Sequence, residues 1–266
     1  TINKVIKDYK TENGKRKFYD IPSGTYLPVP GSDAFIILEN LRDNAVVWKN
    51  SGTTLTDIGE GVLNLEFHTK MNTIGGEVLE GINKAIDIAE KDFRGLVIGN
   101  DGANFSAGAN LAMVFMFAIE QEYDEIDYAI RAFQNANMRV RYSSVPVVVA
   151  PHGLTLGGGC EMSMHADQVQ AAAETYIGMV EFGVGLIPGG GGSKEFTLRF
   201  SDSIKEGDIE LNLLKERFLT IAMAKVSTSA AEAFDLGIFR QGTDAVTLNR
   251  SRLIADARAA VVALAD

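Results

Sequence analysis

The chain has 266 residues, of which 46% are hydrophobic, with a formal net charge of -10 and an isoelectric point near 4.9. This length suits one large domain, or a core domain with an appendage. The acidic balance argues against nucleic acid or an anionic membrane surface as the main partner, because both require a positively charged face.

Cysteine and histidine usage exclude two kinds of stabilising site. The single cysteine, Cys160, allows no internal disulfide and fits a reducing compartment, so we expect a cytoplasmic location. Histidine and cysteine occur nowhere at metal-ligand spacing, so no metal site is expected.

The longest apolar run, residues 111–119, is far shorter than the roughly 20 residues that cross a bilayer, so no membrane partner is expected.

The chain divides into three parts by pattern. Residues 1–43 are polar and rich in turn-forming residues, which is typical of an N-terminal extension or linker, and the chain opens at Thr1 without a methionine, as at a fragment boundary. Residues 44–200 form the predicted core, and residues 201–266 are predicted to be almost entirely helical from residue 211 onward.

Within the core, strand-like and helical segments alternate, which predicts an α/β fold. Strands are expected at 44–50 and at 62–67, where alternating apolar and polar residues indicate a half-buried strand. A helix with apolar residues at helical spacing ends near Asp92, and further strands are expected from short apolar runs. These runs lie at 95–99, at 146–150 and near Val169, with a long helix between the first two that carries Ile126, Ile130, Phe133 and Asn137.

The first candidate site segment is 104–111 (NFSAGANL), which follows a predicted strand and precedes an apolar helix. Its small side chains would let a ligand approach the main chain, where N–H groups at a helix start can receive developing negative charge. Taken alone, such a turn is more often simple packing than a site.

The second segment is 152–161 (HGLTLGGGCE), which follows a buried strand and opens a helix. Three consecutive glycines leave amide donors and the positive end of the helix dipole uncovered, with Glu161 in the first turn. The glycine spacing does not match GxGxxG, and no GK[ST] sequence occurs, so we expect neither an NAD site nor a Walker phosphate loop in this chain.

The third segment is 179–193 (MVEFGVGLIPGGGGS), where Glu181 stands before a glycine run. Desolvation among apolar neighbours would raise the pKa of its carboxyl, which suits proton transfer near neutral pH. Taken singly, Glu181 could also be an exposed loop residue, and Glu161 could be an acid that satisfies the helix dipole.

Four further residues with reactive side chains are expected to be structural. His68, His152 and His165 are scattered along the chain, and no histidine is placed in sequence as a base for Cys160. We therefore interpret Cys160 as a buried small residue.

In order and separation, the three segments resemble those of the crotonase (enoyl-CoA hydratase/isomerase) superfamily, and the match extends from about Ala45 to the end of the chain. The resemblance implies a ClpP-like spiral of ββα units with a helical C-terminal region. It also implies a coenzyme A thioester as substrate, no bound cofactor, and a homo-oligomer based on trimers.

By position, the resemblance implies that the N–H groups of Ala109 and Gly158 bind the thioester oxygen and that Glu161 and Glu181 are the two acid/base residues. Residues 67–74 (FHTKMNTI) resemble the segment that receives the adenine end of coenzyme A. The residues expected to contact coenzyme A are Lys70, next to a phosphate, and Met71, Asn72, Ala107, Asn110 and Leu111.

Retention of both glutamates favours hydration of trans-2-enoyl-CoA to 3-hydroxyacyl-CoA, a step of fatty acid β-oxidation. The alternatives are an enoyl-CoA isomerase or an acyl-CoA hydrolase of the same fold, or a non-catalytic acyl-CoA-binding domain. Residues 17–24 (KFYDIPSG) and 65–72 (LEFHTKMN) also resemble the hydratase part of bacterial bifunctional 3-hydroxyacyl-CoA dehydrogenases. A dehydrogenase domain of a longer parent chain is therefore an expected partner.

Overall fold

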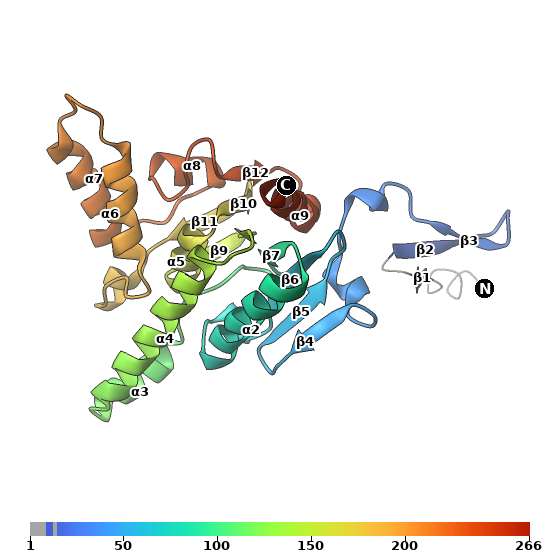
Figure 1. Ribbon diagram of the computed structural model, residues 1–266, viewed down its shortest axis with the longest axis horizontal. Coiled ribbons are helices and arrows are strands. Elements are labelled where there is room, and N and C mark those ends of the chain that lie inside the picture. Colours follow the sequence, from blue (N-terminus) through green and yellow to red (C-terminus); the bar gives the residue numbers. More distant parts are fainter. Residues whose placement is uncertain (1–8, 13–14) are drawn as a thin grey trace.

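A seven-stranded mixed sheet forms the centre of the computed structural model, which describes residues 9–12 and 15–266 (Figure 1). The strand order is β12-β10-β8-β7-β6-β5-β4, antiparallel from β4 to β6 and parallel from β6 to β12. In chain order the strands are β4 (Val46–Lys49), β5 (Thr53–Asp57), β6 (Val62–Phe67), β7 (Gly95–Ile98), β8 (Val147–Val149), β10 (Gln168–Ala172) and β12 (Ala245–Thr247).

Helices cover both faces of this sheet. Helices α2 (Gly76–Asp92) and α9 (Leu253–Ala265) pack on its two faces, and the other helices are α3 (Leu111–Ile119), α4 (Tyr123–Arg141), α5 (Gly158–His165), α6 (Gly192–Ser203), α7 (Glu210–Ala222) and α8 (Ala230–Asp235). Short 3-10 helices connect them: η1 (Ser32–Ala34), η2 (Leu38–Leu41), η3 (Lys70–Asn72), η4 (Glu181–Val184) and η5 (Arg250–Arg252). The alternation of strands and helices confirms the predicted α/β class.

The buried strand β7 shows how the two faces are covered. Leu96 and Ile98 pack in the cluster that contains the apolar face of α2, whereas Val97 packs in the cluster that contains the apolar face of α9. In register, Leu96 lies opposite Val147 of β8. Because both faces are covered by helices, the strand is a continuous apolar run.

Strand β6 differs from its predicted half-buried state. All six of its residues are buried, including Asn64 and Glu66 on the face expected to meet solvent. The Asn64 amide donates to the carbonyl of Gly99 over 3.0 Å, and the Glu66 carboxylate accepts from Arg42 over 2.8 Å. The polar face is therefore covered, and each side chain has a protein partner in place of water, whereas Asn64 Oδ1 and Glu66 Oε2 have no hydrogen-bond partner among the described residues.

A second, two-stranded sheet carries the chain into α5. It pairs β9 (Gly153–Leu156) in parallel with β11 (Thr175–Gly178). Strand β9 lies inside the glycine-rich segment at 152–161, ahead of the helix start predicted there. Its pairing fixes where the first turn of α5 begins.

The two ends of the chain add elements to this core. In the N-terminal part, β1 (Tyr9–Glu12), β2 (Lys15–Asp20) and β3 (Thr25–Pro28) form an antiparallel sheet that stands apart from the main body in Figure 1. Residues 1–8 and 13–14 of the predicted extension lie outside the described residues. The C-terminal region is helical as predicted, except that β12 joins the main sheet beside β10, where the sequence was interpreted as helical.

Among the described residues, none of the helices combines the length and apolar character that crossing a bilayer requires.

Candidate active site

The first two glycine-rich segments lie side by side. The Ser106 N–H donates to the carbonyl of Leu154 over 3.1 Å, and the Leu156 N–H donates to the carbonyl of Ser106 over 2.9 Å. This pairing brings Gly108 against the start of α5, where a Cβ on Gly108 would lie 3.1 Å from the amide nitrogen of Gly158. Two segments about fifty positions apart thus meet at one turn.

Gly108 occupies a position that no other residue fits. Its φ of +85° lies in the left-handed region, and a Cβ there would lie 2.7 Å from the carbonyl oxygen of Leu156. Its own carbonyl accepts from the Ile74 N–H over 2.8 Å, which fixes the turn from the other side.

Ala109 and Gly158, the two predicted amide donors, follow directly on these turns. Ala109 is exposed at the end of the first segment, and Gly158 is the first residue of α5. Within the part of the chain that the structure describes, neither N–H has a hydrogen-bond acceptor. Both amides can therefore donate to a ligand that reaches the turn.

Glu161 lies in the first turn of α5 and is only 2% exposed. Its Oε1 accepts a hydrogen bond from the Gly192 N–H over 2.9 Å. Burial, followed by the charge of Glu181, raises the pKa of Glu161 to about 7, while the N–H groups of Gly192 and Gly190 act in the opposite direction. The carboxyl can therefore both accept and release a proton near neutral pH.

Glu181 begins η4 and approaches the same turn. A Cβ on Gly157 would lie 3.0 Å from its Oε1, so the carboxyl lies next to the residue that precedes α5. Its Oε2 is buried and has no hydrogen-bond partner among the described residues. Burial raises the pKa of this carboxyl as well. The structure thus brings Glu161 and Glu181 to the two glycine-rich turns.

The segment predicted to receive coenzyme A packs against residues 104–111. The Ala107 N–H donates to the carbonyl of Met71 over 3.1 Å, and the Asn72 side-chain amide donates to the carbonyl of Asn104 over 3.1 Å. Lys70 and Met71 are exposed, whereas Asn72 is buried. Beside them, the run from Ala109 to Asn110 and Leu111 is exposed.

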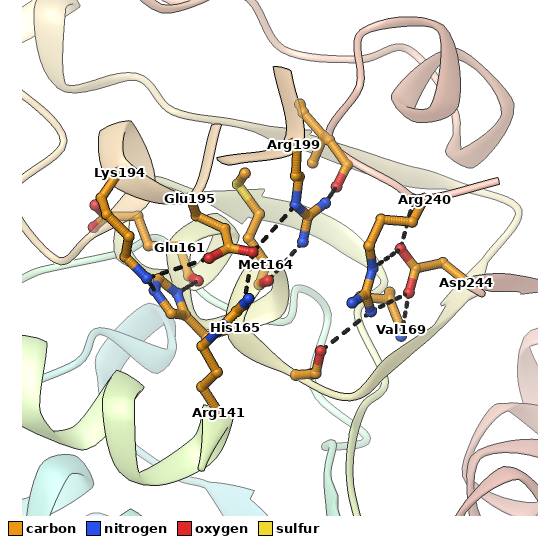
Figure 2. A network of polar contacts seen from close by, with 12 residues as sticks. Arg141, Glu161, Met164, His165, Val169, Lys194, Glu195, Arg199, Arg240 and Asp244 are labelled. Carbon is orange, nitrogen blue, oxygen red and sulfur yellow. Dashed lines mark hydrogen bonds and ion pairs between the residues drawn. The ribbon is translucent and has the colours of Figure 1, made fainter. Parts of the chain in front are cut away.

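A buried polar network lies behind Glu161 (Figure 2). His165 Nδ1 lies 2.6 Å from the backbone oxygen of Glu161, and His165 Nε2 lies 3.1 Å from Lys194 Nζ. Burial lowers the pKa of His165 to about 4, so the imidazole is neutral at pH 7. Glu195 then accepts from Lys194 over 3.2 Å and from Arg141 over 2.7 Å. The network connects α5, α6 and the end of α4.

The other candidate side chains lie apart from the two acids. His152 Nε2 lies 2.9 Å from the carbonyl oxygen of Gly102, and burial lowers the pKa of His152 to about 4. His68 Nε2 lies 2.9 Å from the hydroxyl of Thr54. Cys160 is fully buried, and burial raises the pKa of its thiol well above the usual value. Its burial agrees with the structural role expected for it.

A cavity of about 480 Å³ lies away from the two acids. It lies between residues 35–37, the loop after β7 and the start of α9, and Asp101 and Arg250 line it. The candidate chemistry is instead at the two glycine-rich turns, because the buried carboxyls with raised pKa are there.

Sequence reasoning missed the contribution of α4 to the site. The Gln134 and Asn137 side chains donate to the carbonyls of Gly189 and Gly190, each over 2.7 Å. A signal was present, because Asn137 is a polar residue at a position where the helical spacing calls for an apolar one. The glycines that it contacts lie 53 positions further along the chain, so their identity could not be predicted.

Comparisons with known proteins give the family and the fold of the chain. Residues 57–204 match the family model for enoyl-CoA hydratase/isomerase. Over 259 residues the chain is 44% identical to a Bacillus subtilis (strain 168) protein named "Probable 3-hydroxyacyl-CoA dehydrogenase", covering 97% of this chain and 32% of that protein. Over 162 residues it is 28% identical to the fatty acid oxidation complex subunit alpha of Psychrobacter cryohalolentis, covering 57% of this chain and 22% of that protein. The chain therefore spans about a third or less of the length of these relatives.

Solved structures share the fold. An enoyl-CoA hydratase from Polaromonas sp. JS666 superposes with a TM-score of 0.66 at 23% identity, covering 80% of this chain and 77% of that one. An enoyl-CoA hydratase from Thermoplasma volcanium GSS1 superposes with a TM-score of 0.62 at 24% identity, covering 78% of this chain and 77% of that one. These superpositions confirm the fold predicted from the sequence.

Proposed function

The chain belongs to the enoyl-CoA hydratase/isomerase family, and from this membership we propose that it hydrates trans-2-enoyl-CoA to 3-hydroxyacyl-CoA. One observation carries the choice of hydration. Two carboxyls with raised pKa lie at the start of α5: Glu161 is in its first turn and its pKa is raised in part by the charge of Glu181, and Glu181 places its Oε1 against Gly157, the residue before the helix. Addition of water needs one group to take a proton and one to give a proton, and two neighbouring carboxyls whose pKa values are both raised can provide both.

The N–H groups of Ala109 and Gly158 hold the thioester oxygen in this proposal. As water adds at the β-carbon, the thioester becomes enolate-like, and two fixed donors meet the charge where it develops. Removal of one such donor typically costs about 3–4 kcal/mol of barrier. Support comes from the two amides, which have no acceptor among the residues described.

The two carboxyls share one bound water. One accepts its proton as the hydroxyl adds to the β-carbon, and the other supplies a proton to the α-carbon, so atoms and charge balance over the step. The charge of Glu181 raises the pKa of Glu161, so in this proposal the protonation state of one carboxyl affects that of the other.

Coenzyme A lies along the exposed edge formed by residues 70–72 and 107–111 in this proposal. Lys70 meets a phosphate, and the neighbouring contacts come from Met71, Asn72, Ala107, Asn110 and Leu111. Support comes from the packing of the two segments against each other and from the exposure of Lys70. We place no NAD in this chain.

The place of the reaction follows from the relatives. Their names include 3-hydroxyacyl-CoA dehydrogenase and fatty acid oxidation complex, so the proposed step belongs to fatty acid β-oxidation in a longer chain with a dehydrogenase domain. In this proposal residues 1–43 are an extension, 44–200 the core and 201–266 the helical region. The protein acts in the cytoplasm as a trimer-based homo-oligomer.

Product analysis tests the proposed reaction. The purified chain is incubated with crotonyl-CoA, the conjugated-enoyl absorbance is followed, and the products are identified by mass. Formation of 3-hydroxybutyryl-CoA supports the hydratase. A moved double bond would identify an isomerase, free coenzyme A a hydrolase, and binding without turnover across a series of chain lengths a non-catalytic domain.

A further inference from the structure

The glycine loop at residues 188–192, between η4 and α6, touches the Glu161 carboxylate. The Gly192 N–H donates to Glu161 Oε1 over 2.9 Å, and the Gly190 N–H acts on the same carboxyl. No side chain fits between them, because a Cβ on Gly190 would lie 2.5 Å from Glu161 Oε2 and one on Gly192 would lie 2.8 Å from its Cγ. The loop therefore presents bare peptide groups to the carboxylate.

The opposite side of this loop is held by α4. Gln134 Nε2 donates to the Gly189 carbonyl and Asn137 Nδ2 donates to the Gly190 carbonyl, each over 2.7 Å. The two donors are three positions apart and therefore lie on one face of the helix. In a trans peptide the C=O and N–H groups point in opposite directions. A donor that holds the Gly189 carbonyl toward α4 thus directs the Gly190 N–H away from α4, to the side of Glu161.

Such anchoring matters because glycine peptides reorient easily. Gly191 has a φ of +107°, and successive glycines have no Cβ to limit rotation of the peptides between them. We propose that Gln134 is a positioning residue that holds the peptide between Gly189 and Gly190 with the Gly190 N–H facing the Glu161 carboxylate, and that Asn137 anchors the next peptide of the same loop. A rotated peptide would present a carbonyl oxygen instead, which repels the ionised carboxylate. The inference rests on the proposed function where it concerns turnover.

The charged and titratable groups around Glu161 are few. Among the described residues they are Glu181 of η4, Arg141 at the end of α4, Lys194, Glu195 and Arg199 of α6, and His165 and Cys160 of α5 itself. Replacing an uncharged amide on α4 changes the charge of none of them. A change in the titration of Glu161 in such a variant therefore reports the orientation of the loop.

Gln134 provides the main test, because it is exposed and its replacement leaves the core intact. Asn135 is the matched control, an exposed amide on the same helix with no partner among the residues described. In Gln134→Ala we expect the pKa of Glu161 to rise, kcat with crotonyl-CoA to fall by about 10-fold or more, and KM to stay within about twofold. In Asn135→Ala we expect none of these changes. Asn137→Leu removes the second anchor of the loop and is expected to change the titration of Glu161 in the same direction.

The titration is measured by ¹³C NMR on protein labelled at glutamate carboxyls, with the Glu161 signal assigned by its loss in Glu161→Gln. An unchanged Glu161 titration in Gln134→Ala overturns the inference, and this variant decides if Asn137→Leu fails to fold. The titration can be measured without turnover. A wild-type chain without hydratase activity would therefore overturn the proposed function, and the NMR titration would still decide whether Gln134 positions the loop.

Discussion

The amide nitrogen of Gly192 donates to Oε1 of Glu161 over 2.9 Å and so joins two residues that are 31 positions apart. Gly192 is the first residue of α6, and Glu161 lies in the first turn of α5, so the amino ends of two helices meet at one carboxyl. Helix amino ends favour the ionised carboxylate, whereas burial and the charge of Glu181 favour the protonated form. Their balance leaves the pKa of Glu161 at about 7.

The two acids are expected to be required for turnover but not for binding. Glu161→Gln and Glu181→Gln each remove one proton carrier while preserving shape. We expect kcat with crotonyl-CoA to fall by about 10²–10⁴-fold in each variant, with binding of a saturated acyl-CoA retained. Stopped-flow absorbance and calorimetry measure the two quantities. Activity within a few-fold of wild type in either variant would remove that residue from the proposed mechanism.

Glu161 is also expected to make stability depend on pH. Between its ordinary pKa of 4.5 and about 7, the folded chain keeps a proton that the unfolded chain releases, so stability falls as pH rises through this window. Glu161→Gln lacks this titration, so above pH 7 its free energy of unfolding should exceed that of wild type by up to about 3 kcal/mol. Urea unfolding at pH 5 and pH 8 measures this difference in unfolding free energy, and Glu120→Gln, at an exposed glutamate, is the control. A pH-independent difference would contradict the expectation.

Gly108→Ala should distort the turn at which the two glycine-rich segments meet. The variant places a Cβ 2.7 Å from the Leu156 carbonyl, at a φ of +85°. Gly207→Ala is the matched control, because its φ is +92° but nothing lies within 4 Å of the added Cβ. We expect Gly108→Ala to lose about 1–3 kcal/mol more unfolding free energy than the control, and to lose turnover as well. Equal losses in both variants would show that the carbonyl contact is unimportant.

Glu195 is expected to be essential for stability. Burial raises the pKa of its carboxyl, but the charges of Arg199 and Arg141 outweigh burial and hold that pKa below its usual value. Glu195→Gln leaves these cations without their buried partner and should cost about 3–5 kcal/mol. The exposed pair of Asp127 and Arg131 offers a comparison, since Asp127→Asn should cost about 1 kcal/mol or less. Denaturant unfolding distinguishes the two, and similar costs would argue against a structural role for the buried network.

Lys70 is expected to affect substrate binding alone. Lys70→Met should raise KM for crotonyl-CoA by about 2- to 5-fold and leave kcat unchanged, because an exposed charge pair with a phosphate contributes about 1 kcal/mol or less. Lys84→Met, at another exposed lysine, is the control. Steady-state kinetics at low and high salt measure the effect. A change in kcat without a change in KM would place Lys70 elsewhere in the mechanism.

Local sequence signals were sufficient for much of the fold. The apolar run at β7 and the helical spacing in α2 predicted both elements, because each buries a face that the pattern itself marks. Strand β12 was missed, since it has three residues and pairs with β10 only through the tertiary fold. The polar face of β6 was expected in solvent, because nothing local indicates that it is covered.

The candidate site could also be predicted only in part. Glu161 and Glu181 stand out in the sequence because each lies beside a run of glycines. Their raised pKa depends on burial by residues far away in the chain, which only the structure supplies. The hydrogen bond from Asn137 to the Gly190 carbonyl could not be predicted from the sequence either, because it joins residues on different elements.

The closing of the main sheet by β12 and α9 also bears on how the chain reaches its native state. The Val169 N–H donates to the Asp244 carboxylate across 75 positions, and α9 covers β7, β8 and β10 from still further along the chain. Pairings at such separation form slowly, because loop-closure entropy is lost before the contacts stabilise the structure. Val97 and Val148 pack in one cluster with Leu253, Ala257 and Val261 of α9. Removal of α9 is therefore expected to expose an apolar face of the sheet and to favour aggregation.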